Sequence, residues 1–136
     1  MFAELAKRME ELSDLEATMY LNLPPANDTD KESIITRRFA KDFKEKHWPE
    51  GCRLPAIYFD PRSIDADRSK RASLHAKCII VDGFELFVSS ANFTRRAQNM
   101  NIEVGVHFKS ETIANQLQRH FASLAALGAL KPLQEV

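Results

Sequence analysis

Three segments carry apolar residues at the three- and four-residue spacing of a helix with one buried face. In the segment 2–12 they are Phe2, Leu5, Met9 and Leu12. A capping box at Thr29 and Glu32 predicts a second helix that runs to about His47. Its apolar face comprises Ile35, Phe39 and Phe43. Ser110 is expected to cap a third helix that ends at Gly128. That helix would bury Ile113, Leu117, Phe121, Leu124 and Leu127.

Shorter apolar runs between these segments predict strands. The first, 17–23, stops at two prolines, and the second covers 54–59. The run 74–81 ends at Asp82-Gly83, a dipeptide typical of tight hairpin turns, and 86–90 is its expected partner. Apolar residues then alternate with others at Ile102, Val104, Val106 and Phe108, which predicts a further strand. Helices and strands are mixed along the chain, so the expected fold class is α/β or mixed α+β.

Composition narrows the class of protein. A chain of 136 residues fits one domain, 1–136, and its 19 basic and 19 acidic residues cancel. The whole molecule therefore has no field that attracts nucleic acid, although a local patch still could. No apolar run is long enough to span a bilayer, and the N-terminus does not have the pattern of a secretory signal. Cys52 and Cys78 form no C-x-x-C pair, so we expect no zinc site and a cytoplasmic, reducing location.

Four polar residues on the expected hairpin have types that suit phosphate chemistry. His75 and Lys77 are two residues apart, so on a strand they project from one face. Ser90 and Asn92 share a face for the same reason. An ammonium and neutral donors would bind phosphate oxygens, while an imidazole would attack phosphorus or move a proton.

The register of the hairpin decides whether these four side chains meet. A two-residue turn would pair Val81 with Phe84 and set His75 opposite Ser90, on one common face. Asp82 lies an odd number of residues after His75, so on a strand its side chain would project from the opposite face. We therefore expect Asp82 at the turn rather than against a bound phosphate.

The spacing of these residues resembles that of the phospholipase D superfamily. The family's H-x-K-x4-D motif matches His75, Lys77 and Asp82, and its downstream Asn-x-Glu matches 101–103. Where the family has Gly-Ser-x-Asn, this chain has Ser89-Ser90-Ala-Asn92, so a serine replaces the usual glycine. The match runs over 74–108. The resemblance implies a phospholipase-D-like half-unit with a central mixed β-sheet flanked by helices.

The same resemblance implies a phosphodiesterase that needs no metal or other cofactor. One histidine attacks the phosphodiester and becomes a phosphohistidine, while a second histidine protonates the leaving oxygen and then activates water. Lys77 and Asn92 would neutralise the charge of the transition state. Glu103 would orient His75 and raise its basicity. The implied catalytic set comprises His75, Lys77, Asp82, Ser90, Asn92 and Glu103.

This mechanism needs two motifs, and the chain carries one. None of His47, His107 and His120 has a lysine two residues later, so none begins a second copy. We therefore expect a homodimer with a shared active site. A piece of a longer protein that holds the second motif, and an inert chain, remain alternatives.

Basic residues on both sides of the motif bear on the substrate. Arg71, Arg95 and Arg96 are expected to bind a polyanionic backbone, although solvated loop charge explains them equally well. A nuclease acting on DNA or RNA, without a membrane partner, is the leading hypothesis. The alternatives are a phospholipid headgroup hydrolase and a non-catalytic binding module in a defence complex. Residues 57–61 also resemble the segment before this motif in nuclease-like members, including the phospholipase-D-like component of DISARM phage-defence systems.

Overall fold

The computed structural model describes residues 2–24, 30–92 and 100–133. The chain forms two compact units, one of Met1–Leu74 with Leu127–Val136 and the other of His75–Ala126. The expected mixed α/β class is confirmed, but the strands are divided between two three-stranded sheets instead of forming one central sheet. A single domain over 1–136 stays a prediction.

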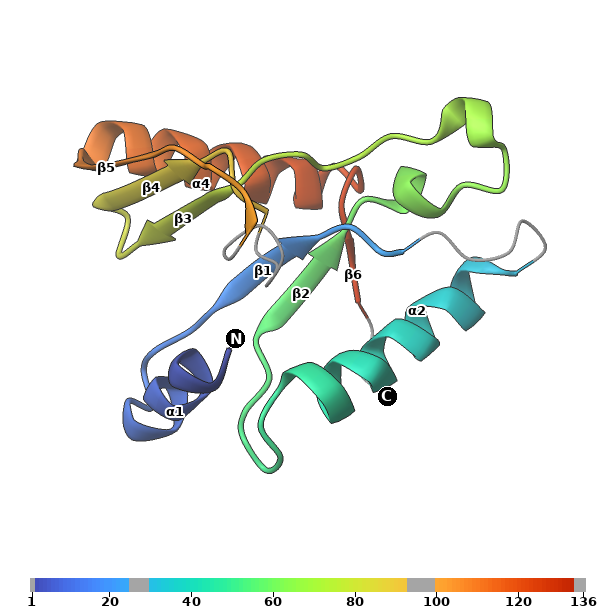
Figure 1. Cartoon of the computed structure of the whole chain (residues 1–136), viewed down its shortest axis with the longest axis horizontal. Coiled ribbons are helices and arrows are strands. Elements are labelled where there is room, and N and C mark those ends of the chain that lie inside the picture. The colour runs from blue at the N-terminus through green and yellow to red at the C-terminus, as the bar shows by residue number, and fades with distance from the viewer. Residues whose placement is uncertain (1, 25–29, 93–99, 134–136) are drawn as a thin grey trace. The chain divides into compact units, whose positions relative to one another are not determined.

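The first unit contains the sheet β1-β2-β6 and two helices (Figure 1). Its main elements are α1 (Ala3–Glu11), β1 (Thr18–Leu21), α2 (Glu32–Asp42), β2 (Ala56–Phe59) and β6 (Lys131–Pro132). A π-helical turn, η1 (Phe43–His47), carries α2 to the end that the sequence predicts. Strand β1 is parallel to β2, whereas β6 is antiparallel to it. The proposed cap Thr29 lies outside the described residues, and the structure places Lys31 at the N-cap.

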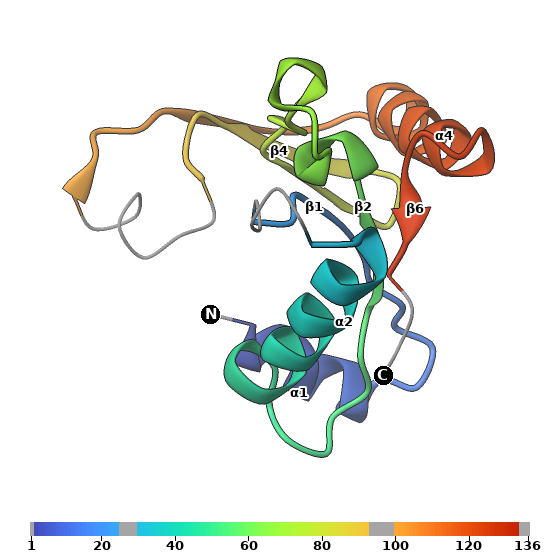
Figure 2. The same ribbon diagram turned by 90° about the vertical axis from the view of Figure 1, so that its right-hand side faces the viewer.

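Both helices of this unit cover one face of β2 (Figure 2). Ile57 and Phe59 are two residues apart on that strand and therefore project to the same side. Ile57 packs with Ala6 and Met9 of α1 and with the aromatic rings of Phe43 and Trp48. Phe59 packs in a second cluster with Leu23, Ile35 and Ile64. The helical periodicity of the sequence thus identified the buried face of α2 and most of that of α1, but Leu12, which was expected on the buried face, is 43% exposed.

Arg53 holds the C-terminal end of α1 against the segment that leads into β2. Its guanidinium donates hydrogen bonds to the backbone carbonyls of Met9, Leu12, Ser13 and Leu15. Its backbone N–H donates to the Glu10 carboxylate at 2.7 Å. These carbonyls include helix-end acceptors that have no partner within the helix, so Arg53 acts as a long-range C-cap.

The polar stretch that follows β2 is ordered by its own side chains. It contains two short 3₁₀ turns, η2 (Pro61–Ile64) and η3 (Arg68–Lys70). Asp60 is 1% exposed, and its carboxylate accepts hydrogen bonds from the backbone and the guanidinium of Arg62, at 2.7 to 3.2 Å. Asp67 accepts from the Ser69 backbone in the same way at the start of η3. This loop is therefore held in shape by its own side chains after β2.

The Asp60 carboxylate should stabilise the fold in a pH-dependent manner. Its hydrogen bond from the Arg62 side chain holds the pKa of Asp60 below its usual range. A depressed pKa in the folded state stabilises the fold fully above the unfolded value of about 4. That stabilisation is lost as the pH falls through the depressed value. We expect Asp60→Asn to lower the free energy of unfolding by about 1–3 kcal/mol at neutral pH.

Urea unfolding at several pH values checks this prediction. The difference between wild type and Asp60→Asn should shrink as the wild-type carboxylate becomes protonated. Asp67→Asn is the matched control, because it changes the same kind of turn at an exposed position. A loss as large in Asp67→Asn as in Asp60→Asn would contradict the assignment.

The second unit is an antiparallel hairpin extended by one strand and packed on one helix (Figure 1). It comprises β3 (Cys78–Val81), β4 (Glu85–Ser89), β5 (Gly105–Lys109) and α4 (Glu111–Ala126), and α4 contacts β4. Strand β3 begins later than the expected residue 74, and β5 begins at 105 rather than 102. Strand β5 starts late because its partner strand β4 ends at Ser89, which pairs with Gly105. Ile102 and Val104 come before this first pair and therefore lie outside the ladder.

The expected register of the hairpin is wrong by one residue. Val81 pairs with Glu85 rather than with Phe84. Asp82 and Gly83 both have left-handed backbone, with φ of 51° and 63°, and the Phe84 N–H closes a tight turn onto the Val81 carbonyl at 3.0 Å. Phe84 then stays outside the ladder with β3, because its carbonyl accepts instead from the Ser110 N–H. A one-residue slip moves every opposing side chain to the other face, so His75 does not stand opposite Ser90.

Helix α4 begins as the sequence predicts but buries a narrower face. The Ser110 hydroxyl accepts a hydrogen bond from the Ile113 N–H at 3.4 Å, so Ser110 caps the helix. Ala114 and Phe121 are buried, whereas Ile113 is 45% exposed. Leu127 is 82% exposed, so it lies outside the buried face that its spacing predicted.

Candidate functional site

The motif histidine and lysine lie just before β3. His75 is exposed, while Lys77 is only 9% exposed. The Lys77 ammonium donates to the His75 carbonyl at 2.9 Å. The Lys77 carbonyl accepts from the Ser89 N–H at 2.9 Å, which extends the β3-β4 pairing one step beyond the strand. The backbone at Lys77 is therefore fixed. The buried side chain of Lys77 lies beside the exposed residue His75.

A hydrogen-bond network on the other side of β4 holds a carboxylate. The Ser90 hydroxyl donates to one Glu103 carboxylate oxygen, and the Asn101 side-chain amide donates to the other at 3.0 Å. Ser90 is itself fixed, since its backbone N–H donates to the Val104 carbonyl at 3.0 Å. The sequence pattern included Asn101 as part of Asn-x-Glu, but its role as a donor to Glu103 was not expected.

Glu103 is electrostatically linked to the motif lysine. Hydrogen bonds from Ser90 and Asn101 lower the pKa of Glu103, and the positive charge of Lys77 lowers it further. Glu103 is therefore a stable anion at neutral pH. Ser90, Asn101 and Glu103 thus form a hydrogen-bonded polar cluster, and the charge of Lys77 acts on its carboxylate. An anion held near a buried cation balances that cation when no phosphate is bound.

The remaining motif residues are less tightly connected. Asp82 lies in the hairpin turn, as its parity predicts. Asn92 follows β4 and is exposed. Within the described residues, Glu103 bonds to Ser90 and Asn101, and no hydrogen bond joins it to His75. The expected role of Glu103 in orienting His75 stays a prediction.

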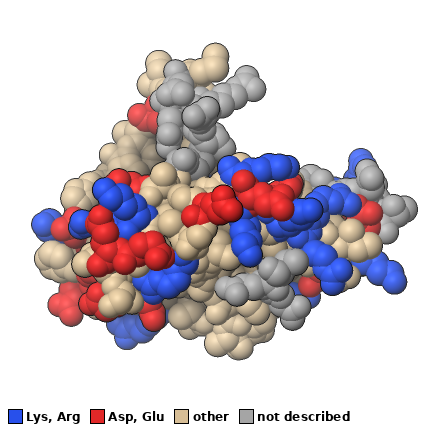
Figure 3. Space-filling view, turned by 90° about the horizontal axis from the view of Figure 1, so that it is seen from below, with Lys and Arg blue, Asp and Glu red and all other residues tan. Residues whose placement is uncertain are grey.

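Of the three arginines that flank the motif, the structure describes Arg71. The Arg71 side chain donates to the Asp65 carbonyl at 2.7 Å, and Arg71 belongs to the first unit. Arg95 and Arg96 lie outside the described residues. On the face drawn in Figure 3, basic and acidic side chains are interspersed, in line with the zero net charge. Binding of a polyanion would thus depend on local contacts.

Ser89 fits the position where the family usually has glycine. Its hydroxyl accepts from the Ala91 N–H at 3.0 Å and donates to the Val104 carbonyl at 3.3 Å. Its ladder partner, Gly105, has little room for a side chain. A Cβ there would lie 2.8 Å from the Phe87 ring. The Phe87 ring would have to move to admit a side chain at Gly105, a requirement that the motif pattern did not indicate.

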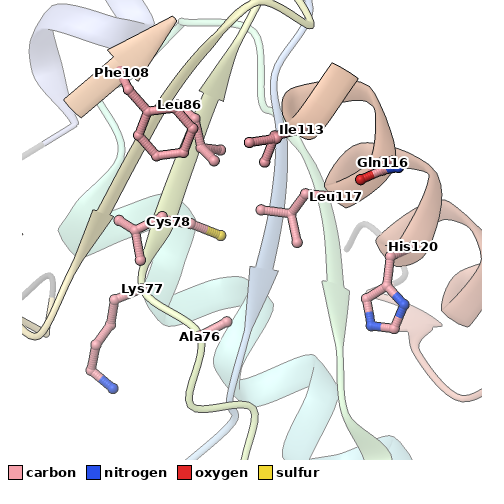
Figure 4. A pocket seen from close by; sticks show the side chains of 10 residues that line it. Ala76, Lys77, Cys78, Leu86, Phe108, Ile113, Gln116, Leu117 and His120 are labelled. Atoms are coloured by element: carbon pink, nitrogen blue, oxygen red, sulfur yellow. The ribbon is translucent and has the colours of Figure 1, made fainter. Parts of the chain in front are cut away.

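A hollow of about 550 Å³ between the sheet and α4 is lined mainly by apolar side chains. Leu86 and Phe108 face Ile113 and Leu117 across it, while the Lys77 ammonium points away (Figure 4). Cys78 also lines it, and burial raises the pKa of this thiol. The polar side chains of the hollow other than Lys77 are Gln116 and His120, both on α4, and none of the motif residues except Lys77 lines it, so the polar cluster is the candidate site.

Two further features of the described residues concern cofactors and membranes. Over 2–24, 30–92 and 100–133, no group of three or more His, Cys, Asp and Glu side chains is arranged to hold a metal ion. No helix in the described part of the chain has the length and apolar character needed to cross a bilayer.

Comparisons with known proteins identify the family of this chain. Residues 4–125 match the family described as "Cardiolipin synthase, PLD-like domain". Cardiolipin synthase C of Escherichia coli (strain K12) is 42% identical over 50 residues, which cover 37% of this chain and 11% of that protein. The chain thus matches a small part of the length of this curated relative. No solved structure matches the chain. Because the family match covers most of the sequence, the chain belongs to the phospholipase D superfamily, in the family of the PLD-like domain of cardiolipin synthase.

Proposed function

We propose that this chain supplies one half of a phosphodiesterase active site, with His75 as its nucleophile. The observation that carries the proposal is the cluster on the motif hairpin: an exposed histidine beside a buried, charge-balanced lysine. A buried ammonium that already has a fixed position neutralises phosphate charge without reorganisation during the reaction. The family match supports the same chemistry.

The proposed reaction has two displacement steps at phosphorus. A His75 ring nitrogen attacks, a P–N bond forms, and the bond from phosphorus to the leaving oxygen breaks. A second histidine protonates that oxygen. Water, deprotonated by the same second histidine, then attacks phosphorus and the P–N bond breaks, which releases a phosphomonoester and restores His75. Lys77 and Asn92 stabilise the charge on the phosphoryl oxygens in both steps.

In this proposal Glu103 balances the charge of Lys77 in the empty site. Its expected hydrogen bond to His75 requires that the carboxylate exchange a bond from Ser90 or Asn101 for one from the imidazole. Substrate binding supplies a reason for the exchange, because an incoming phosphate becomes the new counter-ion of Lys77. Glu103 would then orient His75 and raise its basicity.

A second copy of the chain is the proposed source of the second histidine. Ile79 and Val81 share strand parity with His75 and Lys77, and they are 47% and 49% exposed. Exposed apolar side chains on the face that bears the motif suit a self-complementary two-fold contact. Such a contact would place two motifs across one cleft, with one active site per dimer.

We propose nucleic acid as the substrate, on the basis of Arg71, Arg95 and Arg96, which flank the motif in the sequence. A phospholipid is the second candidate, because the family description and the Escherichia coli relative both name cardiolipin synthase. The cytoplasmic location and a part in phage defence stay predictions.

Side-by-side turnover assays separate these substrates. Wild type and His75→Ala would be incubated with single-stranded DNA, RNA, double-stranded DNA and phosphatidylglycerol vesicles, each with and without EDTA. We expect turnover of a nucleic acid that needs His75 and resists EDTA, because side chains neutralise the phosphate. Turnover of the vesicles alone would favour the phospholipid candidate. Binding of nucleic acid without turnover of any substrate would contradict the enzyme and indicate a binding module.

A further inference from the structure

The hydroxyl of Ser89, the last residue of β4, links the end of that strand to the chain on either side of it. It accepts a hydrogen bond from the Ala91 N–H at 3.0 Å and donates one to the Val104 carbonyl at 3.3 Å. The first bond forms a turn in which a serine side chain takes the place of a backbone acceptor. The second joins this turn to the residue just before β5. A glycine at this position would form neither bond.

This turn matters because Ala91 directly precedes Asn92. Ser90, inside the turn, is held by its own N–H, which donates to the Val104 carbonyl at 3.0 Å. Between described residues, the bond from the Ala91 N–H to Ser89 is then the last that fixes the backbone before Asn92, which is exposed. The Ser89 hydroxyl is consequently the side chain that sets the direction in which the chain leaves β4 toward Asn92.

We infer that Ser89 is a positioning residue for Asn92. It acts through the Ala91 N–H and does not touch the substrate. All three residues belong to the second unit, so the contact is internal to that unit. The inference rests on the proposed function, in which the Asn92 amide stabilises charge on the phosphoryl oxygens. One preorganised donor contributes about 100- to 1,000-fold to kcat, and a displaced donor loses part of that contribution. We therefore expect Ser89→Ala to lower kcat about 10- to 100-fold with little change in KM.

A double-mutant cycle tests whether Ser89 acts through Asn92. Ser89→Ala, Asn92→Ala and the double variant would be assayed for hydrolysis of bis(p-nitrophenyl) phosphate, a chromogenic phosphodiester. If the hydroxyl serves to position the Asn92 amide, its loss has no further effect once that amide is gone. We therefore expect the double variant to have the same kcat as Asn92→Ala alone. Losses of kcat that multiply in the double variant would overturn the inference.

Two further variants separate positioning from a loss of stability. Ser89→Thr keeps the hydroxyl, and its added methyl group meets no side chain on the β5 side, because Gly105 is the ladder partner there. We expect its kcat to be near that of wild type. Ser110→Ala is the matched control, because it removes a serine hydroxyl that accepts from the Ile113 N–H in the same unit, after the other end of β5. It should lower the melting temperature and leave kcat unchanged. A fall of kcat in either variant as large as in Ser89→Ala would contradict the positioning role.

The outcomes separate this inference from the proposed function. Wild-type turnover that His75→Ala lacks, together with an unchanged kcat in Ser89→Ala, would overturn the inference and leave the proposed function standing. Absence of any wild-type turnover would count against the proposed function. In that case the NMR resonances of the Asn92 side-chain amide decide the inference. We expect them to shift in Ser89→Ala and to stay close to wild type in Ser89→Thr and Ser110→Ala, and unchanged resonances in Ser89→Ala would overturn it.

Discussion

Replacing His75 with alanine should abolish phosphodiester hydrolysis and leave the fold intact. The imidazole is the proposed nucleophile, so the proposed covalent intermediate cannot form without it. Removing a nucleophile lowers the turnover rate by about a thousandfold or more. His75 is exposed, and the described contact that it makes with Lys77 uses its backbone carbonyl, which alanine retains. Turnover assays with circular dichroism and thermal unfolding as controls check this result.

The same variant also tests the shared active site. If each site needs a histidine from both copies, heterodimers of wild type and His75→Ala should be largely inactive. Mixing and re-equilibrating the two proteins should then lower the activity below the share contributed by wild-type chains. Activity that falls only in proportion to that share would indicate independent sites. Full activity of His75→Ala by itself would refute the nucleophile.

Removing the Lys77 ammonium should cost nearly as much. We expect Lys77→Met to raise the barrier by about 3–4 kcal/mol, the scale seen when one preorganised donor is removed from a developing anion. Methionine keeps much of the buried stem of Lys77, so packing is largely preserved. The loss should appear mainly in kcat. Steady-state kinetics of the variant on the best substrate measures it.

Lys109→Met is the matched control for Lys77→Met. Lys109 belongs to the same sheet, but its ammonium pairs with Glu85 at 2.9 Å and its side chain is exposed. Its loss should leave kcat unchanged. Removing Lys77 should also raise the pKa of Glu103, because the lysine charge contributes to the depression of that pKa. Equal losses of kcat in both variants would contradict a specific role for Lys77.

Local sequence signals were sufficient to identify most of the elements. Apolar residues at helical spacing predicted α1 and α2, and the buried residues Ile35 and Phe43 confirm that spacing. Asp82-Gly83 predicted the hairpin turn, because both positions need left-handed backbone. The types of the motif residues predicted a phosphate site, and the family match agrees with them. These signals depend on neighbours within a few residues, so one sequence reveals them.

The features that could not be predicted from the sequence all depend on contacts between residues far apart in the chain. The register differs because the Phe84 carbonyl accepts from the Ser110 N–H and not from Val81, and the turn dipeptide gives no sign of that contact. The Asn22 side chain donates a hydrogen bond to the Leu74 carbonyl, 52 residues away in the chain, and a lone asparagine after a strand has no distinguishing pattern. The division of strands between two sheets likewise depends on pairing that apolar runs do not specify.

The most direct test of the account is to identify the covalent intermediate. Wild-type protein would be mixed with a slowly hydrolysed phosphodiester, quenched in alkali to preserve a phosphoramidate, digested, and analysed by mass spectrometry. We predict one modified peptide, with the phosphoryl group on the His75 side chain, and no modification in the His75→Ala protein. A phosphoryl group on another residue, or turnover without any covalent intermediate, would contradict it.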